Sequence, residues 1–290
     1  FVTEGLALRQ WRNLVSMPHM LILDEFHERH LDVDMLLSLA AKERLDGGTL
    51  GLVVMSATLD AEPISEFLGG LPIVASGGRQ FPVAMDYLPP RDQEYMEVTV
   101  SRALREILKD KDDQGDILVF LPGVAEIRRA QEKLQPLASQ FNLQLLPLHG
   151  GLSPKEQDLA VAPAAKRKIV LATNVAETSL TIDGVTAVVD TGTARVARHS
   201  PWTGLASLQV EPISRASAKQ RAGRAGRTRA GRCIRLYNKH ELAGRREFDP
   251  AEIIRSDLAA PTLQLAAEGT SMSDIAWLNP PPEVAQKAAN

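Results

Sequence analysis

The chain contains little cysteine and few aromatic residues. Among its 290 residues there is one cysteine, Cys233, and aromatic side chains make up 4% of the sequence. A single cysteine excludes an internal disulfide, which fits a reducing compartment such as the cytoplasm, and with scattered histidines it excludes a zinc site of the Cys/His type. Because 44% of the residues are nevertheless hydrophobic, we expect aliphatic cores, as is typical of layered α/β domains.

The sequence also lacks long uncharged hydrophobic runs and an excess of basic residues. No run approaches the roughly 20 residues that a membrane-spanning helix needs, and the first residues do not resemble a signal peptide. We therefore expect no association with a membrane. The formal net charge is −3, so a nucleic acid would have to be held by local clusters of charge rather than by a basic field over the whole protein.

The sequence also lacks the motif of a loop that binds nucleotide phosphates. The pattern G-x-x-x-x-G-K-[ST], whose backbone N–H groups and lysine hold such phosphates, occurs nowhere in the sequence. The first residue is Phe1 rather than Met. We therefore expect the chain to be part of a longer protein, although it is long enough for two domains with their own cores.

Two adjacent carboxylates mark the most informative stretch. An apolar run at 20–23, too short for a helix, ends in Asp24 and Glu25, and His27 follows. Such a run predicts a buried parallel strand, and catalytic residues of open α/β sheets lie where these strands end. One carboxylate can hold a metal ion through water while its neighbour orients a nucleophilic water. Taken alone, an ordinary strand-to-loop junction fits these residues equally well.

Alternation of apolar runs with helical patterns predicts α/β units with parallel sheets. A Gly-, Pro- and charge-rich stretch at 77–92 is expected to link two domains. Ser153, Pro154 and Glu156 have the pattern of a helix start with a capping box. The remaining predictions are strands at 50–55, 117–121, 144–148, 168–172 and 185–189, a helix at 95–109, and a β-hairpin at 194–210.

A basic segment with two glycines is the strongest local signal. In a helix Gln220, Arg224 and Arg227 would share one face, since they stand at i, i+4 and i+7. Gly223 and Gly226 would each cost roughly 1 kcal/mol in that helix, which makes sense if another group approaches the backbone closely. Planar guanidinium groups match phosphate oxygens, so we favour a phosphate-binding role over an ordinary solvated basic helix.

A hydroxyl-rich loop at 173–183 follows the predicted strand at 168–172. Hydroxyl groups, Asn174 and backbone N–H groups suit contacts to phosphates and sugars that do not depend on base sequence. The same residues also fit an ordinary capped turn.

Six segments in this order resemble the superfamily 2 helicases, specifically the DEAH-box RNA helicase family. They match motifs Ib, II, III, IV, V and VI at Thr3–Gly5, Asp24–His27, Ser56–Thr58, Phe120–Gly123, Thr173–Asp183 and Gln220–Arg227, respectively. Phe26 departs from the Ala that is usual in motif II. With Glu28 and Arg29 after it, this variant looks like the bacterial HrpB-type branch.

The resemblance implies an α/β protein with two RecA-like parallel-sheet domains, ATP between them and a single RNA strand across both. The expected divisions are the C-terminal part of domain 1 at 1–78, domain 2 at 79–248 and the start of a winged-helix region at 249–290. The hairpin at 195–208 resembles the strand-separating element of the family. In the family the phosphate-binding loop precedes motif Ib, so this stretch alone is expected to be inactive.

The resemblance also assigns roles to residues. Asp24 would hold Mg²⁺ through water, and Glu25 would activate the attacking water. Residues that reach the γ-phosphate would be Gln220, Arg224 and Arg227. Residues that contact the nucleotide would be Thr181 and Asp183, and those that couple hydrolysis to domain movement would be His27, Ser56 and Thr58. RNA-backbone contacts would come from Thr3, Gly123, Thr173 and Asn174.

The function implied is that of a cytoplasmic, bacterial ATP-dependent RNA helicase that uses ATP and Mg²⁺. Two alternatives stay open. One is a catalytically dead nucleic-acid-binding or scaffold protein that never had the phosphate-binding loop. The other is a DNA-directed superfamily 2 helicase, because backbone contacts alone do not identify the sugar.

Overall fold

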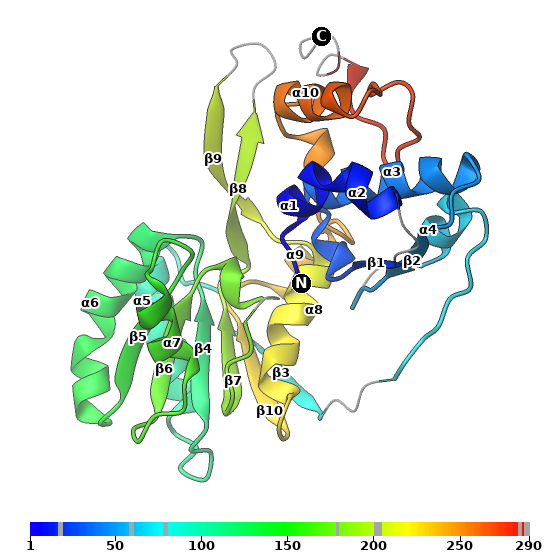
Figure 1. Ribbon diagram of the computed structural model, residues 1–290. Helices are drawn as coiled ribbons and strands as arrows, with labels where there is room; N and C mark the ends of the chain where they lie inside the picture. Colours follow the sequence, from blue (N-terminus) through cyan, green and yellow to red (C-terminus); the bar gives the residue numbers. More distant parts are fainter. Residues whose placement is uncertain are drawn as a thin grey trace. The chain divides into compact units, whose positions relative to one another are not determined.

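The computed structural model describes residues 1–16, 20–57, 61–77, 81–177, 180–199, 205–283 and 286. These residues form two compact units (Figure 1). Unit 1 comprises Phe1–Ser76, Ala197–Leu208 and Pro250–Asn290. Unit 2 comprises Gly77–Val196 and Gln209–Asp249.

Unit 1 contains a short parallel sheet and the helices around it. Strands β1 and β2 pair in parallel, with Met20 opposite Gly51 and Leu23 opposite Val54. The parallel strands predicted at 20–23 and 50–55 are therefore confirmed, the second with slightly shorter bounds. The prediction that they are buried was wrong, because Met20, Ile22 and Val53 are exposed. The elements are α1 (Glu4–Arg9), α2 (Trp11–Val15), β1 (Met20–Leu23), η1 (Phe26–Glu28), α3 (Leu31–Leu45), β2 (Gly51–Val54), α4 (Glu62–Phe67), η4 (Glu252–Ile254) and α10 (Ala259–Ala267).

Helix α3 is the centre of the unit 1 core. Residues 33–41 of this helix are all buried, so α3 is covered on every side, unlike a surface helix with one apolar stripe. Side chains from both ends of the chain pack into this cluster, including Trp11, Ile253, Leu265 and Met272. Residues 250–279 therefore share one core with the first 76 residues.

Unit 2 is built on one six-stranded sheet with the order β3-β10-β7-β4-β6-β5 (Figure 1). All five neighbouring pairs are parallel, which confirms the predicted parallel α/β fold. The strands are β3 (Val83–Tyr87), β4 (Asp116–Phe120), β5 (Gln144–Leu148), β6 (Lys168–Ala172), β7 (Val185–Asp190) and β10 (Gly231–Arg235). The helices are α5 (Met96–Ile107), α6 (Val124–Gln140), α7 (Pro154–Val161), η2 (Asn174–Ala176), α8 (Arg215–Gly223), η3 (Arg224–Gly226) and α9 (Lys239–Ala243).

Both faces of this sheet are covered by helices. Alternate residues of a strand point to opposite faces; in β4, Ile117 and Val119 belong to one hydrophobic cluster, and Leu118 and Phe120 to another. Helices α5 and α6 contribute to the first cluster, and α7 and α8 to the second. Burial on both faces explains why β4, β6 and β7 are continuous apolar runs in the sequence.

The stretch 77–92, predicted to pass between two domains, begins where the two units divide, but it is not only a connection. Strand β3 lies inside this stretch and pairs with β10, Val83 opposite Gly231 and Tyr87 opposite Arg235. As an edge strand β3 is only partly buried, so it needs no continuous apolar run. Pro82 directly before it is compatible with the start of an edge strand. The surrounding Gly, Pro and charged residues concealed this element in the sequence.

Two local predictions are confirmed. Helix α7 starts with the full capping box, since Glu156 N donates to Ser153 Oγ and Ser153 N donates to the Glu156 side chain. Strands β8 (Thr193–His199) and β9 (Ala206–Pro212) pair as a two-stranded sheet, the predicted hairpin. Residues 200–204 between them lie outside the described residues. In the part of the chain that is described, no helix is both long and apolar enough to cross a bilayer.

Candidate nucleotide and nucleic-acid site

A sharp turn at the end of β1 presents the two carboxylates of motif II. Met55 N donates to Leu23 O (2.8 Å) and Phe26 N to Met55 O (3.0 Å), so the chain stays paired with the neighbouring segment on both sides of the turn. Glu25 has φ 50°, a left-handed conformation that costs roughly 1–2 kcal/mol for a residue with a side chain. Asp24 Oδ1 accepts from Glu25 N at 2.8 Å, and both carboxylates are exposed.

His27 connects this turn to motif III. Its side chain is 6% exposed, and Nδ1 lies 3.4 Å from Glu25 Oε2 and 3.4 Å from Ala57 N. One ring nitrogen cannot donate to Glu25 and accept from Ala57 at once, so the tautomer decides which contact is a hydrogen bond. Nε2 is buried without a hydrogen-bond partner among the described residues. Ser56 is exposed beside Ala57, and Thr58 lies outside the described residues.

Three of the four predicted RNA-binding residues lie just beyond the carboxyl ends of two adjacent inner strands of the unit 2 sheet. Gly123 follows β4, and Thr173 and Asn174 follow the adjacent strand β6. The two strand ends are held together because Leu121 N donates to Ala172 O at 2.8 Å. Asn174 is exposed, and Gly123 is the N-cap of α6. Thr3, the fourth residue, is the exposed N-cap of α1 in unit 1.

The predicted helix over 220–227 is interrupted. Helix α8 ends at Gly223, and Arg224–Gly226 forms a single 3₁₀ turn, so the i, i+4, i+7 face does not extend to Arg227. Gly223 is the last residue of α8 and keeps right-handed helical angles, at a position where a poor helix former is tolerated. Gln220 remains on α8 and is half-buried.

The motif VI arginines lie against motif V. Arg224 is 5% exposed, and its Nε and Nη1 donate to the carbonyl oxygens of Glu177 (2.9 Å) and Leu180 (2.7 Å). Arg227 is exposed, and its Nη1 donates to Thr181 Oγ1 at 2.7 Å. Motifs V and VI therefore form one polar surface in unit 2. Asp183 is exposed two residues beyond Thr181.

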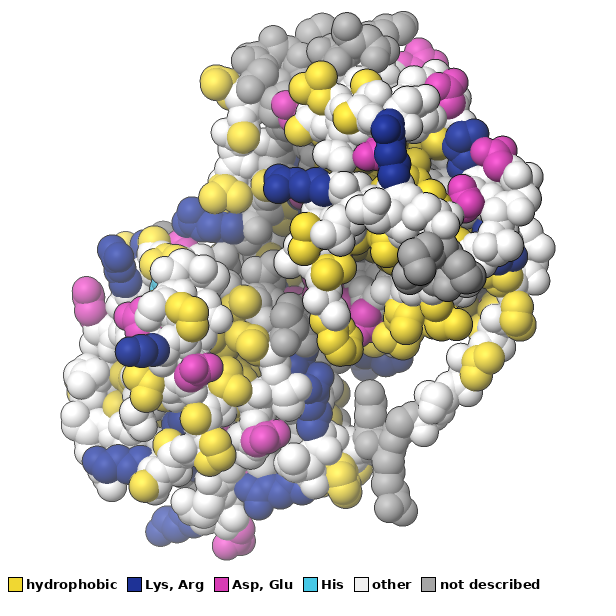
Figure 2. All heavy atoms as spheres, in the orientation of Figure 1, with side chains coloured by type: hydrophobic (Ala, Val, Ile, Leu, Met, Phe, Trp, Pro, Cys, Tyr) yellow, Lys and Arg dark blue, Asp and Glu magenta, His cyan; other side chains and the backbone are white. Residues whose placement is uncertain are grey.

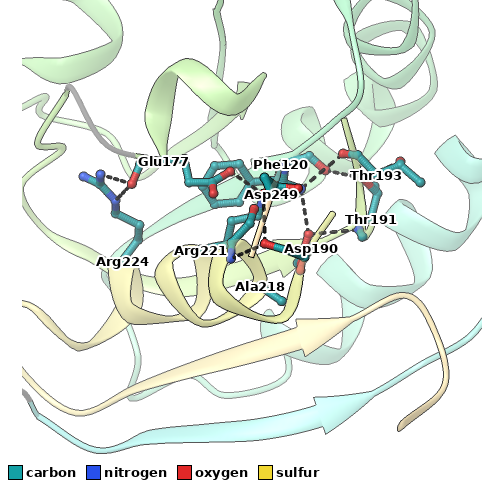
Figure 3. A network of polar contacts seen from close by, with 12 residues as sticks. Phe120, Glu177, Asp190, Thr191, Thr193, Ala218, Arg221, Arg224 and Asp249 are labelled. Atoms are coloured by element: carbon teal, nitrogen blue, oxygen red, sulfur yellow. Dashed lines mark hydrogen bonds and ion pairs between the residues drawn. The ribbon is translucent and has the colours of Figure 1, made fainter. Parts of the chain in front are cut away.

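Behind this surface lies a buried cluster of charged side chains that the sequence did not reveal (Figure 3). Arg221 is fully buried; its Nε donates to Glu177 Oε2 at 3.0 Å and its Nη1 to Asp190 Oδ1 at 2.9 Å. The guanidinium also lies over the Phe120 ring, 4.8 Å from its centre. Asp190 accepts from the hydroxyl of Tyr237 at 2.7 Å as well. The one available signal was Asp190 itself, an acid at the end of an apolar strand.

Burial and neighbouring charges shift the pKa values of Glu177 and Arg221 in opposite directions. Burial raises the pKa of the Glu177 carboxyl above its ordinary value, while the nearby Arg221 lowers it. Burial alone would lower the pKa of Arg221, but Glu177 and Asp190 raise it above its ordinary value. Removal of one partner from a buried pair leaves an uncompensated charge, at a cost of about 3–5 kcal/mol. Glu177 therefore holds Arg221 through its carboxylate and Arg224 through its carbonyl.

Unit 2 is similar to a known class of domain. Residues 99–229 match the model of the helicase conserved C-terminal domain, and they cover most of the parallel sheet of unit 2. Unit 2 thus has the RecA-like fold of helicase C-terminal domains, as the resemblance predicted.

Relatives extend the match over the whole chain. The ATP-dependent RNA helicase HrpB of Escherichia coli K12 is 42% identical over 296 residues, which cover 99% of this chain and 36% of that protein. The HrpA homologue of Haemophilus influenzae is 40% identical and matches 92% of this chain and 21% of its own length. The chain therefore spans only about a third or less of the length of these relatives.

Solved structures agree with these relatives. A crystal structure of the E. coli DExH-box NTPase HrpB matches with a TM-score of 0.87 and 41% identity, over 99% of this chain and 36% of that one. A crystal structure of E. coli DEAH/RHA helicase HrpB matches with a TM-score of 0.86 and 40% identity over the same shares. Over nearly its whole length the chain is therefore similar to DEAH-box helicases of the HrpB type, in agreement with the resemblance drawn from its motifs.

The two motif VI glycines are expected to respond differently to substitution by alanine. A Cβ at Gly226 would lie 2.6 Å from Phe81 O, a backbone atom that cannot move easily, so Gly226→Ala should cost about 1–3 kcal/mol of stability. A Cβ at Gly223 would meet nothing within 4 Å. Gly223→Ala should therefore leave stability unchanged or raise it by up to about 1 kcal/mol. Urea unfolding of both variants measures these changes, and equal losses of stability would contradict the packing difference.

Proposed function

We propose that these residues serve in an ATP-dependent RNA helicase that couples ATP hydrolysis to translocation on RNA and to unwinding. The observation that carries the proposal is the exposed Asp24–Glu25 turn at the end of a parallel strand, joined to Ala57 of motif III through His27. Relatives named ATP-dependent RNA helicases HrpB and HrpA support the assignment. The intact Glu25 argues against a binding-only protein, which would have no use for a base that activates water.

Asp24 is the proposed ligand of Mg²⁺, bound through water. In this structure its carboxylate is exposed, and the described residues contain no group of three or more His, Cys, Asp or Glu side chains that could surround a metal ion. That environment fits Mg²⁺, which usually binds one or two protein carboxylates together with waters and substrate phosphates. When bound, Mg²⁺ would neutralise charge on the phosphates of ATP.

Glu25 is the proposed general base. Its exposed carboxylate can accept a proton from the water that attacks the γ-phosphate. His27, Ser56 and Thr58 would transmit the state of this carboxylate to the rest of the protein. The 3.4 Å contacts of the His27 ring with Glu25 and Ala57 support that role for the histidine.

Gln220, Arg224 and Arg227 are the proposed γ-phosphate residues of unit 2, with Thr181 and Asp183 at the nucleotide. Arg224 donates to backbone carbonyls of motif V in this structure. To stabilise charge on a phosphate, its guanidinium would have to exchange these carbonyls for phosphate oxygens. Planar bidentate geometry makes arginine suited to that exchange.

RNA contacts are proposed at Thr3, Gly123, Thr173 and Asn174. In Figure 2, Lys and Arg side chains on the visible face are scattered among Asp and Glu side chains and form no single basic field. This distribution favours contacts to the sugar-phosphate backbone through hydroxyls, amides and backbone N–H groups.

Competition between RNA and DNA of one sequence distinguishes the RNA helicase from a DNA-directed enzyme. The domain division at 78/79 and 248/249 and a cytoplasmic location belong to the same proposal.

Glu25→Gln in the full-length protein should lower kcat for ATP by orders of magnitude and leave KM nearly unchanged. The substitution keeps the shape of the side chain and removes the base, so only transition-state stabilisation is lost. Steady-state phosphate release with saturating RNA measures both constants. The control is Glu66→Gln, an exposed glutamate on α4, which should behave like the wild type. A wild-type kcat in Glu25→Gln would refute the assignment.

Arg224→Ala and Arg227→Ala should each slow single-turnover hydrolysis far more than they weaken ATP binding. An arginine that stabilises a transferring phosphoryl group contributes roughly 10³ to 10⁵ in rate, and Arg224→Lys should restore little because an ammonium lacks the planar fork. Arg229→Ala is the control, since Arg229 pairs with Asp113 at 3.1 Å. Unchanged rates in both Arg224→Ala and Arg227→Ala would contradict the proposed role.

The 290-residue polypeptide alone should show no RNA-stimulated ATPase activity above background. It has no G-x-x-x-x-G-K-[ST] sequence, so the β- and γ-phosphates would not be held for attack. A phosphate-release assay beside the full-length protein provides the comparison. Robust RNA-dependent turnover by the polypeptide alone would mean that it holds the phosphates in another way.

A further inference from the structure

The turn that carries Glu25 ends at a second residue with a left-handed backbone, Arg29. Its φ is 51°, a conformation that persists only where surrounding contacts stabilise it. The guanidinium of Arg29 donates to both oxygens of Asp34, at 2.8 and 3.1 Å, and to Asn279 Oδ1 at 2.7 Å. It also lies over the Phe26 ring, 5.3 Å from its centre, and Phe26 is fully buried. Arg29 is thus held partly by a residue 250 positions further along the chain.

Glu252 holds the next residues of the same turn. Its backbone N donates to Arg29 O at 2.9 Å, and its Oε2 accepts from Leu31 N at 2.9 Å. Leu31 N is one of the first amides of α3, which have no partner within the helix, so Glu252 caps α3 from a distant part of the chain. The His30 ring lies between two carboxylates, 2.6 Å from Glu28 and 3.5 Å from Glu252.

The charges in this cluster reinforce one another. Hydrogen bonds to Glu252 and Glu28 raise the pKa of His30 to about 10, and the bond with His30 lowers the pKa of Glu252 to about 2. His30 is therefore protonated and Glu252 ionised at neutral pH.

We propose that Glu252 and Asn279 are positioning residues for Glu25. Glu25 and Arg29 are the two left-handed residues at the ends of one short turn, and Glu28 N donates to Glu25 O at 3.0 Å inside it. A shift of Arg29 therefore changes the direction of the Glu25 carboxylate. Residues 250–279 lie outside the matched helicase C-terminal domain and so act on the catalytic turn from a separate segment. The inference rests on the proposed function, in which Glu25 is the base.

The test compares variants of the full-length protein in RNA-stimulated ATP hydrolysis. Asn279→Leu removes the acceptor for Arg29 and should lower kcat between about tenfold and a hundredfold, the scale of loss when a catalytic group is displaced, with KM changed less than about twofold. Asn279→Asp retains an acceptor oxygen and should restore kcat. Glu252→Gln keeps the shape, weakens the contact to His30 and should lower kcat several-fold. Thermal unfolding and circular dichroism establish that each variant is folded.

Arg12→Ala provides the matched control. Arg12 donates to Glu268 Oε2 at 3.1 Å and to Ala267 O at 2.7 Å, so this variant loses contacts to the same C-terminal segment away from the catalytic turn. It should keep the wild-type kcat. The inference is overturned if folded Asn279→Leu or Glu252→Gln loses no more kcat than Arg12→Ala, or if Asn279→Asp fails to restore turnover. Glu25→Gln is measured beside them: wild-type turnover there would refute the proposed function itself.

Discussion

The polar surface of unit 2 depends on one buried guanidinium. Arg221 is fully enclosed, and its charge is balanced by Glu177 from the loop after β6 and by Asp190 at the end of β7. These contacts join α8 to two strand ends in the middle of the sheet. Because the same Glu177 accepts from Arg224 through its carbonyl, the Arg221 pair also determines where the proposed phosphate-binding arginine lies.

Unit 1 uses a similar arrangement around its carboxylates. The Arg29 side chain is 11% exposed and pairs with Asp34 as Arg221 pairs with Glu177. In each unit one arginine fixes a polar loop at the end of a parallel strand, and the residues proposed to meet ATP or water lie beside it. Arginine suits this use because its fork bridges two acceptors in a fixed geometry, and it stays charged when buried. Stability of the loops and placement of the reacting groups are therefore linked.

Much of the fold followed from the sequence because the central strands are buried on both faces. The apolar runs at 117–121, 168–172 and 185–189 correspond to β4, β6 and β7 for that reason. Strand β3 was missed because an edge strand needs no such run. The break after Gly223 was missed because helical spacing alone does not show where a helix ends. The motif residues were recognisable in order. Arg221, however, lies 44 positions from Glu177 and 31 positions from Asp190 in the sequence, and only the fold brings these side chains together.

The claim that the Arg221–Glu177 pair organises unit 2 is tested most directly by a double-mutant cycle. Urea unfolding of the wild type, Glu177→Gln, Arg221→Met and the double variant gives the free energy of unfolding of each. Arg221→Met should cost about 3–5 kcal/mol, because it leaves the buried carboxylates of Glu177 and Asp190 without a counter-charge. Glu177→Gln should cost about 1–3 kcal/mol, because it weakens a hydrogen bond to a charged group while Asp190 still pairs with Arg221. The double variant should cost less than the sum of the two by about 2 kcal/mol or more. Costs that add to within about 0.5 kcal/mol would show that the two side chains act independently and would contradict the account.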